Sequence, residues 1–219
     1  MVYLKLQRVH ARDRERARIA RDLHDDLGAN LSEIAMMSEL AKDELPADDP
    51  TRAHFGEISE RASSNVRRLS DIVWAINPAN DTLEGMAGFL CKFAQDYLAR
   101  AQIRCRLDVP ETMPNVLLDS VQRHNLALAV KEAVHNAVRH GAPSEVLLGI
   151  ATGGGRITIT VRDNGRGFDT TRDVVENHGS TNMRVRMEQM GGTFARQSVP
   201  GQGTTVVFTV PFTAPRSSS

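Results

Sequence analysis

Residues 15–28 read ERARIARDLHDDLG and belong to a helical pattern that organises the first part of the chain. Apolar or small side chains recur there in steps of three or four, at Ile19, Leu23, Leu27, Leu31, Ile34, Ser38, Ala41 and Leu45. This period predicts one amphipathic helix over about residues 4–45. Pro46 and Pro50 follow and break it.

The same period returns in a second stretch, at Phe55, Ile58, Ala62, Val66, Leu69, Val73 and Ile76. This second helix is predicted to end at Asn77, because the residue before a proline disfavours helical backbone. Two long helices joined by a short turn form a helical hairpin. One hairpin cannot bury both apolar stripes, so we expect a homodimer whose two hairpins close a four-helix bundle. The first domain is predicted to span residues 1–80.

Helices and strands alternate after Thr82. We expect helices at about 82–102, 120–140 and 181–190, and strands at 103–109, 145–151, 156–161, 193–199 and 204–210. Thr82 and Asp119 are predicted N-caps, and Gly141 is predicted to follow a helix end. This order predicts an α/β sandwich, one mixed sheet with helices on one face, over residues 81–212. Residues 213–219 are expected to form a disordered tail.

Composition narrows the class of protein. Lys plus Arg and Asp plus Glu each number 27, so the net charge is zero. A protein that binds nucleic acid by neutralising phosphates usually carries a basic excess, so we expect no nucleic-acid partner. No apolar run reaches the ~18–20 residues of a membrane span. We therefore expect no membrane contact within this chain and a cytoplasmic location. Because the helical pattern near Leu4 begins without a cap, we also expect the chain to be part of a longer protein that continues upstream. Cys91 and Cys105 are expected to be reduced thiols.

His24 and Asp25 together have the parts of an activated nucleophile. At ~100° per residue, His24 lies roughly 70° from the centre of the apolar stripe, at a solvent-accessible edge of the bundle. A carboxylate that binds one ring nitrogen leaves the other free to attack an electrophile. Gly28, one turn later, would clear space beside the imidazole. A surface histidine in a charged helix explains the same residues without any chemistry.

A second polar set lies on the helix predicted after Asp119. Glu132, Asn136, Arg139 and His140 follow one another at helical spacing and share one face. Carboxylate and amide oxygens suit Mg²⁺, and a basic residue one turn on can reach a phosphate. A polar outer face of an amphipathic helix is the alternative.

Residues 163–168 read DNGRGF and follow a predicted strand. A buried carboxylate at Asp163 can accept a hydrogen bond from an adenine amino group, and Gly165 and Gly167 allow a close backbone approach. A hairpin turn is the alternative. No strand follows directly, and the polar stretch 169–180 predicts a lid instead.

The stretch GQGTT at residues 201–205 precedes the last strand. Gly203 and Thr204 could line a nucleotide pocket, although a tight turn explains them as well. Residues 153–155 are predicted to form only a hairpin. No Walker A motif is present, which excludes a P-loop enzyme.

In this order the motifs resemble those of sensor histidine kinases of two-component systems, over about residues 12–211. Residues 15–28 and the stretch IVWAINP at 72–78 resemble the subclass with an HD phosphoacceptor motif, related to nitrate and membrane-fluidity sensors. The second half resembles the ATP-binding fold shared with DNA gyrase and mismatch-repair ATPases.

The resemblance implies that ATP phosphorylates His24, with Asp25 as general base, before transfer to the receiver aspartate of a response regulator. Asn136 would hold Mg²⁺ on the phosphates, helped by Glu132. Asp163 would recognise adenine, with Gly165 and Gly167 shaping that wall.

Two departures from the family pattern stand out. Gly179 matches the second glycine of the next box, but the first glycine is absent from NHGS at 177–180. Ala29 stands where relatives with phosphatase activity carry glutamine, which predicts weak or absent phosphatase activity. A non-catalytic or signal-dependent ATP-binding dimerisation module is the alternative. An ATPase or anti-sigma-type serine kinase is disfavoured, because it would leave the His24 hairpin without a purpose.

Overall fold

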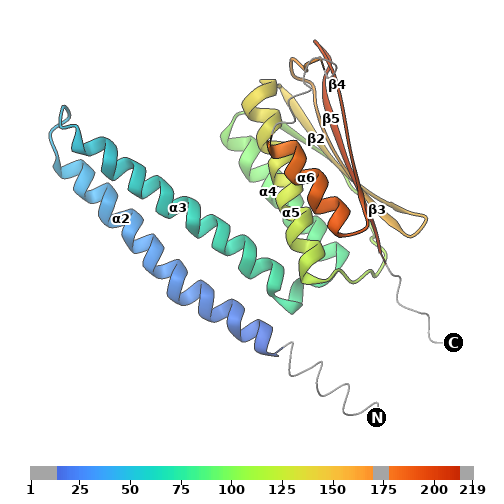
Figure 1. The fold of residues 1–219 in the computed structure, drawn as a ribbon, viewed down its shortest axis with the longest axis horizontal. Coiled ribbons are helices and arrows are strands. Elements are labelled where there is room, and N and C mark those ends of the chain that lie inside the picture. The colour runs from blue at the N-terminus through green and yellow to red at the C-terminus, as the bar shows by residue number, and fades with distance from the viewer. Residues whose placement is uncertain (1–13, 170–177, 213–219) are drawn as a thin grey trace. The chain divides into compact units, whose positions relative to one another are not determined.

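The computed structural model describes residues 14–169 and 178–212. The chain divides into two compact units, Met1–Asn80 and Asp81–Ser219. The start of the first predicted helix, most of the predicted lid and the predicted tail lie outside the described residues, as does the side chain of His24. Figure 1 shows the helices and strands of both units.

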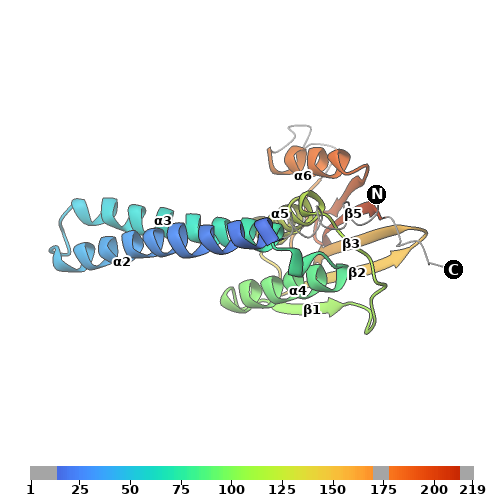
Figure 2. The same cartoon turned by 90° about the horizontal axis from the view of Figure 1, so that it is seen from below.

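The first unit is a helical hairpin, as predicted. Residues 14–22 are helical and lead through a π-helical turn, Leu23–Gly28, into α2 (Ala29–Glu44). The antiparallel partner α3 (Thr51–Ile76) lies beside α2 in both ribbon views (Figures 1 and 2). It ends before Pro78, since Asn77 adopts an extended conformation with ψ of 120°. A 3-10 turn, Pro78–Asn80, follows.

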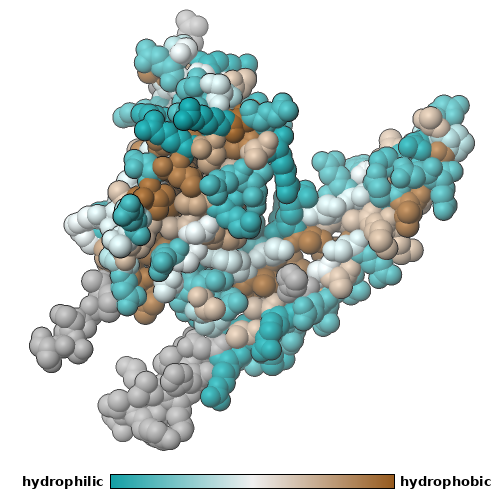
Figure 3. Space-filling view, turned by 180° about the vertical axis from the view of Figure 1, so that it is seen from behind, coloured by the Kyte–Doolittle hydropathy of each residue, from teal (hydrophilic) through white to brown (hydrophobic). Residues whose placement is uncertain are grey.

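Small residues lie between α2 and α3, while large apolar residues stay exposed. Ser38 and Ala62 are buried in the hairpin. Between 39 and 59% of the surface stays exposed for a set of larger side chains, namely Ile19, Leu27, Ile34, Met36, Met37, Leu40, Ile58 and Ile72. Apolar side chains are visible along the hairpin in Figure 3. The hairpin alone therefore leaves part of its apolar surface in water, as the two sequence stripes predict.

The second unit is an α/β sandwich with a mixed sheet, which confirms the predicted fold class. Its strands follow the order β1-β2-β3-β5-β4, with β1 parallel to β2 and every other pair antiparallel. The helices lie on one side of this sheet (Figure 1). In chain order the elements are α4 (Leu83–Arg100), β1 (Arg104–Asp108), α5 (Ser120–Asn136), a π-helical turn (Ala137–Gly141), β2 (Glu145–Gly153), β3 (Arg156–Asp163), α6 (His178–Gln189), β4 (Thr193–Val199) and β5 (Gly203–Pro211).

The core of this unit follows the two-residue alternation of the strands. Side chains of β2, β3 and β5 that face the helices are buried, among them Val146, Leu148, Ile157, Ile159, Val161, Phe208 and Val210. The helices contribute side chains with no exposed surface, namely Met86, Leu90, Leu98, Leu126, Val130 and Met187. Burial of this apolar surface holds the helices against the sheet.

Both predicted N-caps are confirmed, but the predicted end of α5 is wrong. Thr82 Oγ1 accepts a hydrogen bond from Gly85 N at 3.1 Å. Asp119 forms a capping box with Gln122. The α-helical part of α5 stops at Asn136, and the left-handed residue that ends the π turn is Ala142, with φ of 47°, rather than Gly141. The absence of a side chain at Gly141 instead leaves room for Asp163, because a Cβ on Gly141 would lie 3.1 Å from Asp163 Oδ1.

A buried arginine ties the start of this unit to α5. Arg123 has no exposed surface, and its Nη1 lies 2.5 Å from Asp81 Oδ1. The same nitrogen donates to the Leu118 carbonyl, while Leu118 N donates to the Asp81 carbonyl at 2.8 Å. Asp81 is thus held by both its side chain and its backbone.

We expect Asp81→Ala to lower the free energy of unfolding of this unit by about 3 kcal/mol, because it removes the carboxylate that is paired with a buried guanidinium. Asp96→Ala is the matched control, since it removes the exposed ion pair to Lys92 and should cost less than about 1 kcal/mol. Hydrogen exchange of the α5 amides measures both. Equal effects of the two substitutions would contradict the role of the buried pair.

Candidate functional site

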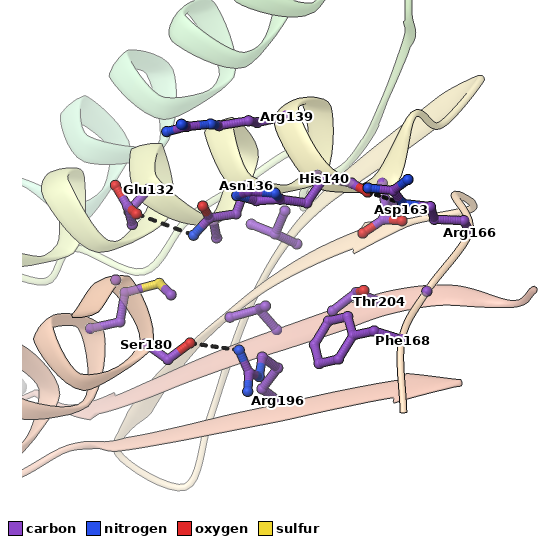
Figure 4. A pocket seen from close by; sticks show the side chains of 18 residues that line it. Glu132, Asn136, Arg139, His140, Asp163, Arg166, Phe168, Ser180, Arg196 and Thr204 are labelled. Carbon is purple, nitrogen blue, oxygen red and sulfur yellow. Dashed lines mark hydrogen bonds between the residues drawn. The ribbon is translucent and has the colours of Figure 1, made fainter. Parts of the chain in front are cut away.

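A cavity of about 440 Å³ opens in the second unit, between α5, its π turn, α6 and the inner face of the sheet (Figure 4). Many of the residues predicted to bind a ligand line it, namely Glu132, Asn136, Arg139, His140, Asp163, Gly167, Gly179 and Thr204. Gly165 and Gly203 are absent from its lining and lie next to Asp163 instead. His24 and Asp25 belong to the other unit.

Glu132 and Asn136 form a polar pair on α5. Asn136 Nδ2 donates to Glu132 Oε1 at 3.2 Å, which leaves the amide oxygen and the second carboxylate oxygen for other partners. Gly179, in the first turn of α6, closes over this pair, since a Cβ there would lie 2.6 Å from Glu132 Oε1. The absence of a side chain at Gly179 therefore allows α6 to approach α5.

This pair fits a hard cation that brings most of its own oxygen ligands. Among residues 14–169 and 178–212, no group of three or more His, Cys, Asp or Glu could hold a metal. A cation beside Glu132 and Asn136 would need further oxygens from water or from a ligand. Mg²⁺ is bound in this way when one or two protein oxygens share it with substrate phosphates.

Asp163 ends β3 and presents a buried carboxyl group at the other end of the cavity. Its side chain is 5% exposed, and Oδ1 accepts a hydrogen bond from Gly165 N at 2.9 Å. Burial raises the pKa of this carboxyl above its usual range, and the backbone N–H groups of Gly165 and Thr204 partly offset that rise. The carboxylate keeps acceptor capacity for a ligand in the cavity.

The glycines around Asp163 allow a close approach between segments of this chain. Gly203 has φ of 83°, and a Cβ there would overlap the Asp163 carbonyl. A Cβ on Gly165 would overlap the Gly141 carbonyl, and one on Gly167 would overlap that of Val199. The missing side chains at Gly165 and Gly203 thus make room for backbone of this chain that packs around Asp163.

Several residues that line the cavity were not predicted from the sequence. Arg166, Phe168, Ser180, Met183 and Arg196 also line it. Arg166 Nε donates to the His140 carbonyl at 2.5 Å and so links the DNGRGF loop to the π turn. The inward position of Arg196 could have been predicted, since strand alternation places it on the same face as Phe194 and Ser198.

On the hairpin, His24 and Asp25 lie in the π-helical turn Leu23–Gly28. Such turns occur frequently at functional sites. The angle predicted between His24 and the apolar stripe assumed a regular α-helix. It therefore does not apply to this π-helical turn. Asp25 is exposed, and a Cβ on Gly28 would lie 4.0 Å from Leu69 Cδ2, an ordinary contact. Packing against α3 therefore does not require a glycine at position 28.

A helical hairpin joined to an α/β sandwich with this cavity defines the two-domain core of a histidine kinase. Residues 15–81 match the family described as "Histidine kinase". Residues 122–214 match the family described as "Histidine kinase-, DNA gyrase B-, and HSP90-like ATPase". The chain belongs to the histidine kinases, a family of ATP-binding transferases in two-component signal transduction.

Its similarity to curated proteins extends over both units. The chain is 30% identical to the nitrate/nitrite sensor protein NarQ of Escherichia coli K12, over 88% of this chain and 34% of that protein. It is 27% identical to the sensor histidine kinase LiaS of Bacillus subtilis, over 90% of this chain and 54% of that protein. It therefore spans about a third to a half of the length of these relatives.

Solved structures show the same fold. The histidine kinase domain of a blue-light activated kinase from Erythrobacter litoralis has a TM-score of 0.54 at 18% identity, covering 84% of this chain and 94% of that one. Full-length ShkA in complex with AMPPNP has a TM-score of 0.57 at 17% identity, covering 92% and 46%. Across the described part of the chain, no helix has the length and apolar character of a membrane span.

The raised pKa of Asp163 predicts the direction in which the stability of the folded chain changes with pH. The folded chain holds the Asp163 proton more tightly than the unfolded chain, whose pKa is about 3.9. Stability should therefore fall as the pH rises from that value through the folded pKa. We expect Asp163→Asn to be more stable than wild type at pH 7 and to lack this fall. Urea unfolding between pH 4 and pH 8 measures both, and a less stable variant at pH 7 would contradict the assignment.

Proposed function

We propose that this chain is the core of an ATP-dependent autokinase that phosphorylates His24 and passes the phosphoryl group to a response-regulator aspartate. The observation that carries the proposal is the cavity itself, which has a buried acceptor, Asp163, at one end and the Glu132–Asn136 pair at the other. An adenine nucleotide has a donor amino group and metal-binding phosphates at its two ends. The share of its relatives that the chain spans supports a longer sensor protein around it.

In the proposed nucleotide complex, Asp163 accepts a hydrogen bond from the adenine amino group. Glu132 and Asn136 would hold Mg²⁺, which neutralises phosphate charge when bound. Arg139 and His140, about one turn further along, can reach the phosphates. The AMPPNP named for ShkA supports an ATP-type ligand for this fold.

The transfer step needs a neutral imidazole nitrogen placed in line with the γ-phosphorus. One ring nitrogen of His24 attacks that phosphorus, and the bond to the β,γ-bridging oxygen breaks to release ADP. Asp25 removes the proton from the other ring nitrogen as it becomes acidic. The phosphohistidine then transfers its phosphoryl group to the receiver carboxylate as the N–P bond breaks, and the ring takes up one proton from solvent to return to neutral imidazole.

The direct test is incubation of the chain with Mg²⁺ and γ-labelled ATP. Wild type should gain acid-labile, base-stable label, and His24→Ala should gain none. Asp25→Asn should label about 10²–10⁴-fold more slowly, the range for loss of a general base. Label that persists in His24→Ala would contradict the phosphoacceptor assignment. Nucleotide binding without label would favour the non-catalytic or signal-dependent module.

We also propose that the chain acts as a homodimer through the hairpin. Six large apolar side chains of α2 and α3 are between 42 and 59% exposed, namely Ile34, Met36, Met37, Leu40, Ile58 and Ile72. Where such side chains gather into a large patch, they mark a protein interaction site. A second hairpin would cover it and complete a four-helix bundle.

We expect Ile34→Lys to raise the dimer dissociation constant at least about tenfold, because it would place a charge in the buried seam. Ser32→Lys adds the same charge at an exposed α2 position whose hydroxyl contacts only the Gly28 carbonyl, and should leave the constant unchanged. Analytical ultracentrifugation compares the two. A wild-type monomer, or equal weakening by both variants, would contradict this interface.

A further inference from the structure

Arg196 is a charged residue on the apolar side of the sheet. It is the central residue of β4 and alternates with Phe194 and Ser198, which face the same way. The corresponding face of β5 is apolar, with Val206, Phe208 and Val210 buried. Arg196 lines the cavity together with the residues proposed to bind nucleotide. A guanidinium at this position requires an explanation, because partial burial of a charge is costly.

Two contacts hold the guanidinium in place. Nη1 donates to Ser180 Oγ at 2.6 Å, and the guanidinium carbon lies 4.9 Å from the centre of the Phe168 ring. Phe168 is itself held, since its N–H donates to Ser198 Oγ at 2.9 Å. Figure 4 shows Arg196 between Ser180 and Phe168, on the wall across the cavity from Asn136.

These contacts connect the two ends of the cavity. Ser180 follows Gly179, which packs against Glu132 at the proposed phosphate end. Phe168 follows Gly167 in the loop that begins with Asp163, at the proposed adenine end. Arg196, on β4, therefore contacts both α6, at Ser180, and the DNGRGF loop, at Phe168.

Among the described residues, the contacts of Arg196 do not include a carboxylate that would neutralise its charge. Within residues 14–169 and 178–212, its partners are a neutral hydroxyl and an aromatic face, with no carboxylate paired to it. Only one of its five N–H donors takes part in these contacts. A polyanionic ligand in the cavity could pair with the remaining donors.

We propose that Arg196 is a nucleotide-positioning residue, which holds Ser180 and Phe168 in register so that both ends of the cavity bind one nucleotide at once. This inference rests on the proposed nucleotide binding. Loss of the guanidinium would uncouple the two walls and weaken affinity. It would change turnover at saturating ATP much less, because Arg196 takes no part in the chemistry.

The test is the dissociation constant for Mg-ATP of the full chain, measured by calorimetry. Arg196→Met should raise the constant about tenfold, as expected for loss of a hydrogen bond to a charged group. Arg196→Lys keeps the charge but lacks the planar fork, so its affinity should lie between Arg196→Met and wild type. The KM for ATP in autophosphorylation should rise with the dissociation constant, while kcat changes less than about threefold.

Two further variants separate positioning from general destabilisation. Ser180→Ala should weaken binding, and adding it to Arg196→Met should cause no further loss, because the two residues act through one contact. Arg184→Met is the matched control, since that guanidinium also lies over an aromatic ring, Phe194, at 5.5 Å, but does not line the cavity. It should bind Mg-ATP like wild type.

Several results would overturn the inference. Wild-type affinity in both Arg196→Met and Ser180→Ala would do so, as would additive losses in the double variant. Equal weakening by Arg184→Met would assign the effect to general destabilisation. If wild type itself binds no Mg-ATP, the proposed function fails together with this inference. The other results leave nucleotide binding intact and reject the role of Arg196 alone.

Discussion

The buried carboxyl group of Asp163 is the constraint on which the second unit depends. Gly165 N holds one of its oxygens, and the backbone of β5 approaches so closely that Gly203 cannot carry a side chain. Gly141, at the end of the π turn, leaves room for the same carboxyl group. Three separate segments of the chain thus converge on one acceptor. Burial raises its pKa. The carboxyl oxygens retain acceptor capacity beyond these contacts, which a bound ligand can use.

The elements themselves could be predicted because their patterns are local. Helical period, proline breaks and the capping residues Thr82 and Asp119 identified the hairpin and the sandwich helices with boundaries close to those observed. The two π turns were not predicted, since the helical period of the sequence was interpreted with regular α-helical spacing throughout. Local sequence pattern also could not predict that the glycines near Asp163 lie against backbone of other segments of this chain. Gly28 remains unexplained by any contact in the hairpin.

Sequence motifs identify some of the residues that line the cavity but not all of them. Glu132, Asn136 and Asp163 follow from helical spacing and from a loop after a strand, and all three line the cavity. Arg196 belongs to no motif, and only its inward position in β4 distinguishes it from an ordinary surface arginine. Arg196 contacts Phe168, directly before the predicted lid sequence, and Ser180, the last residue of that sequence.

Selectivity between ATP and GTP tests the central claim most directly. The Asp163 carboxylate matches the amino group of adenine, whereas guanine presents a carbonyl oxygen at the equivalent position and would repel it. Calorimetry with the wild-type chain and each Mg-nucleotide should give at least about hundredfold tighter binding of ATP, in the range of sites built to recognise a hydrogen-bonding group. Equal affinity for the two nucleotides would contradict the role of Asp163 as the acceptor that selects the base.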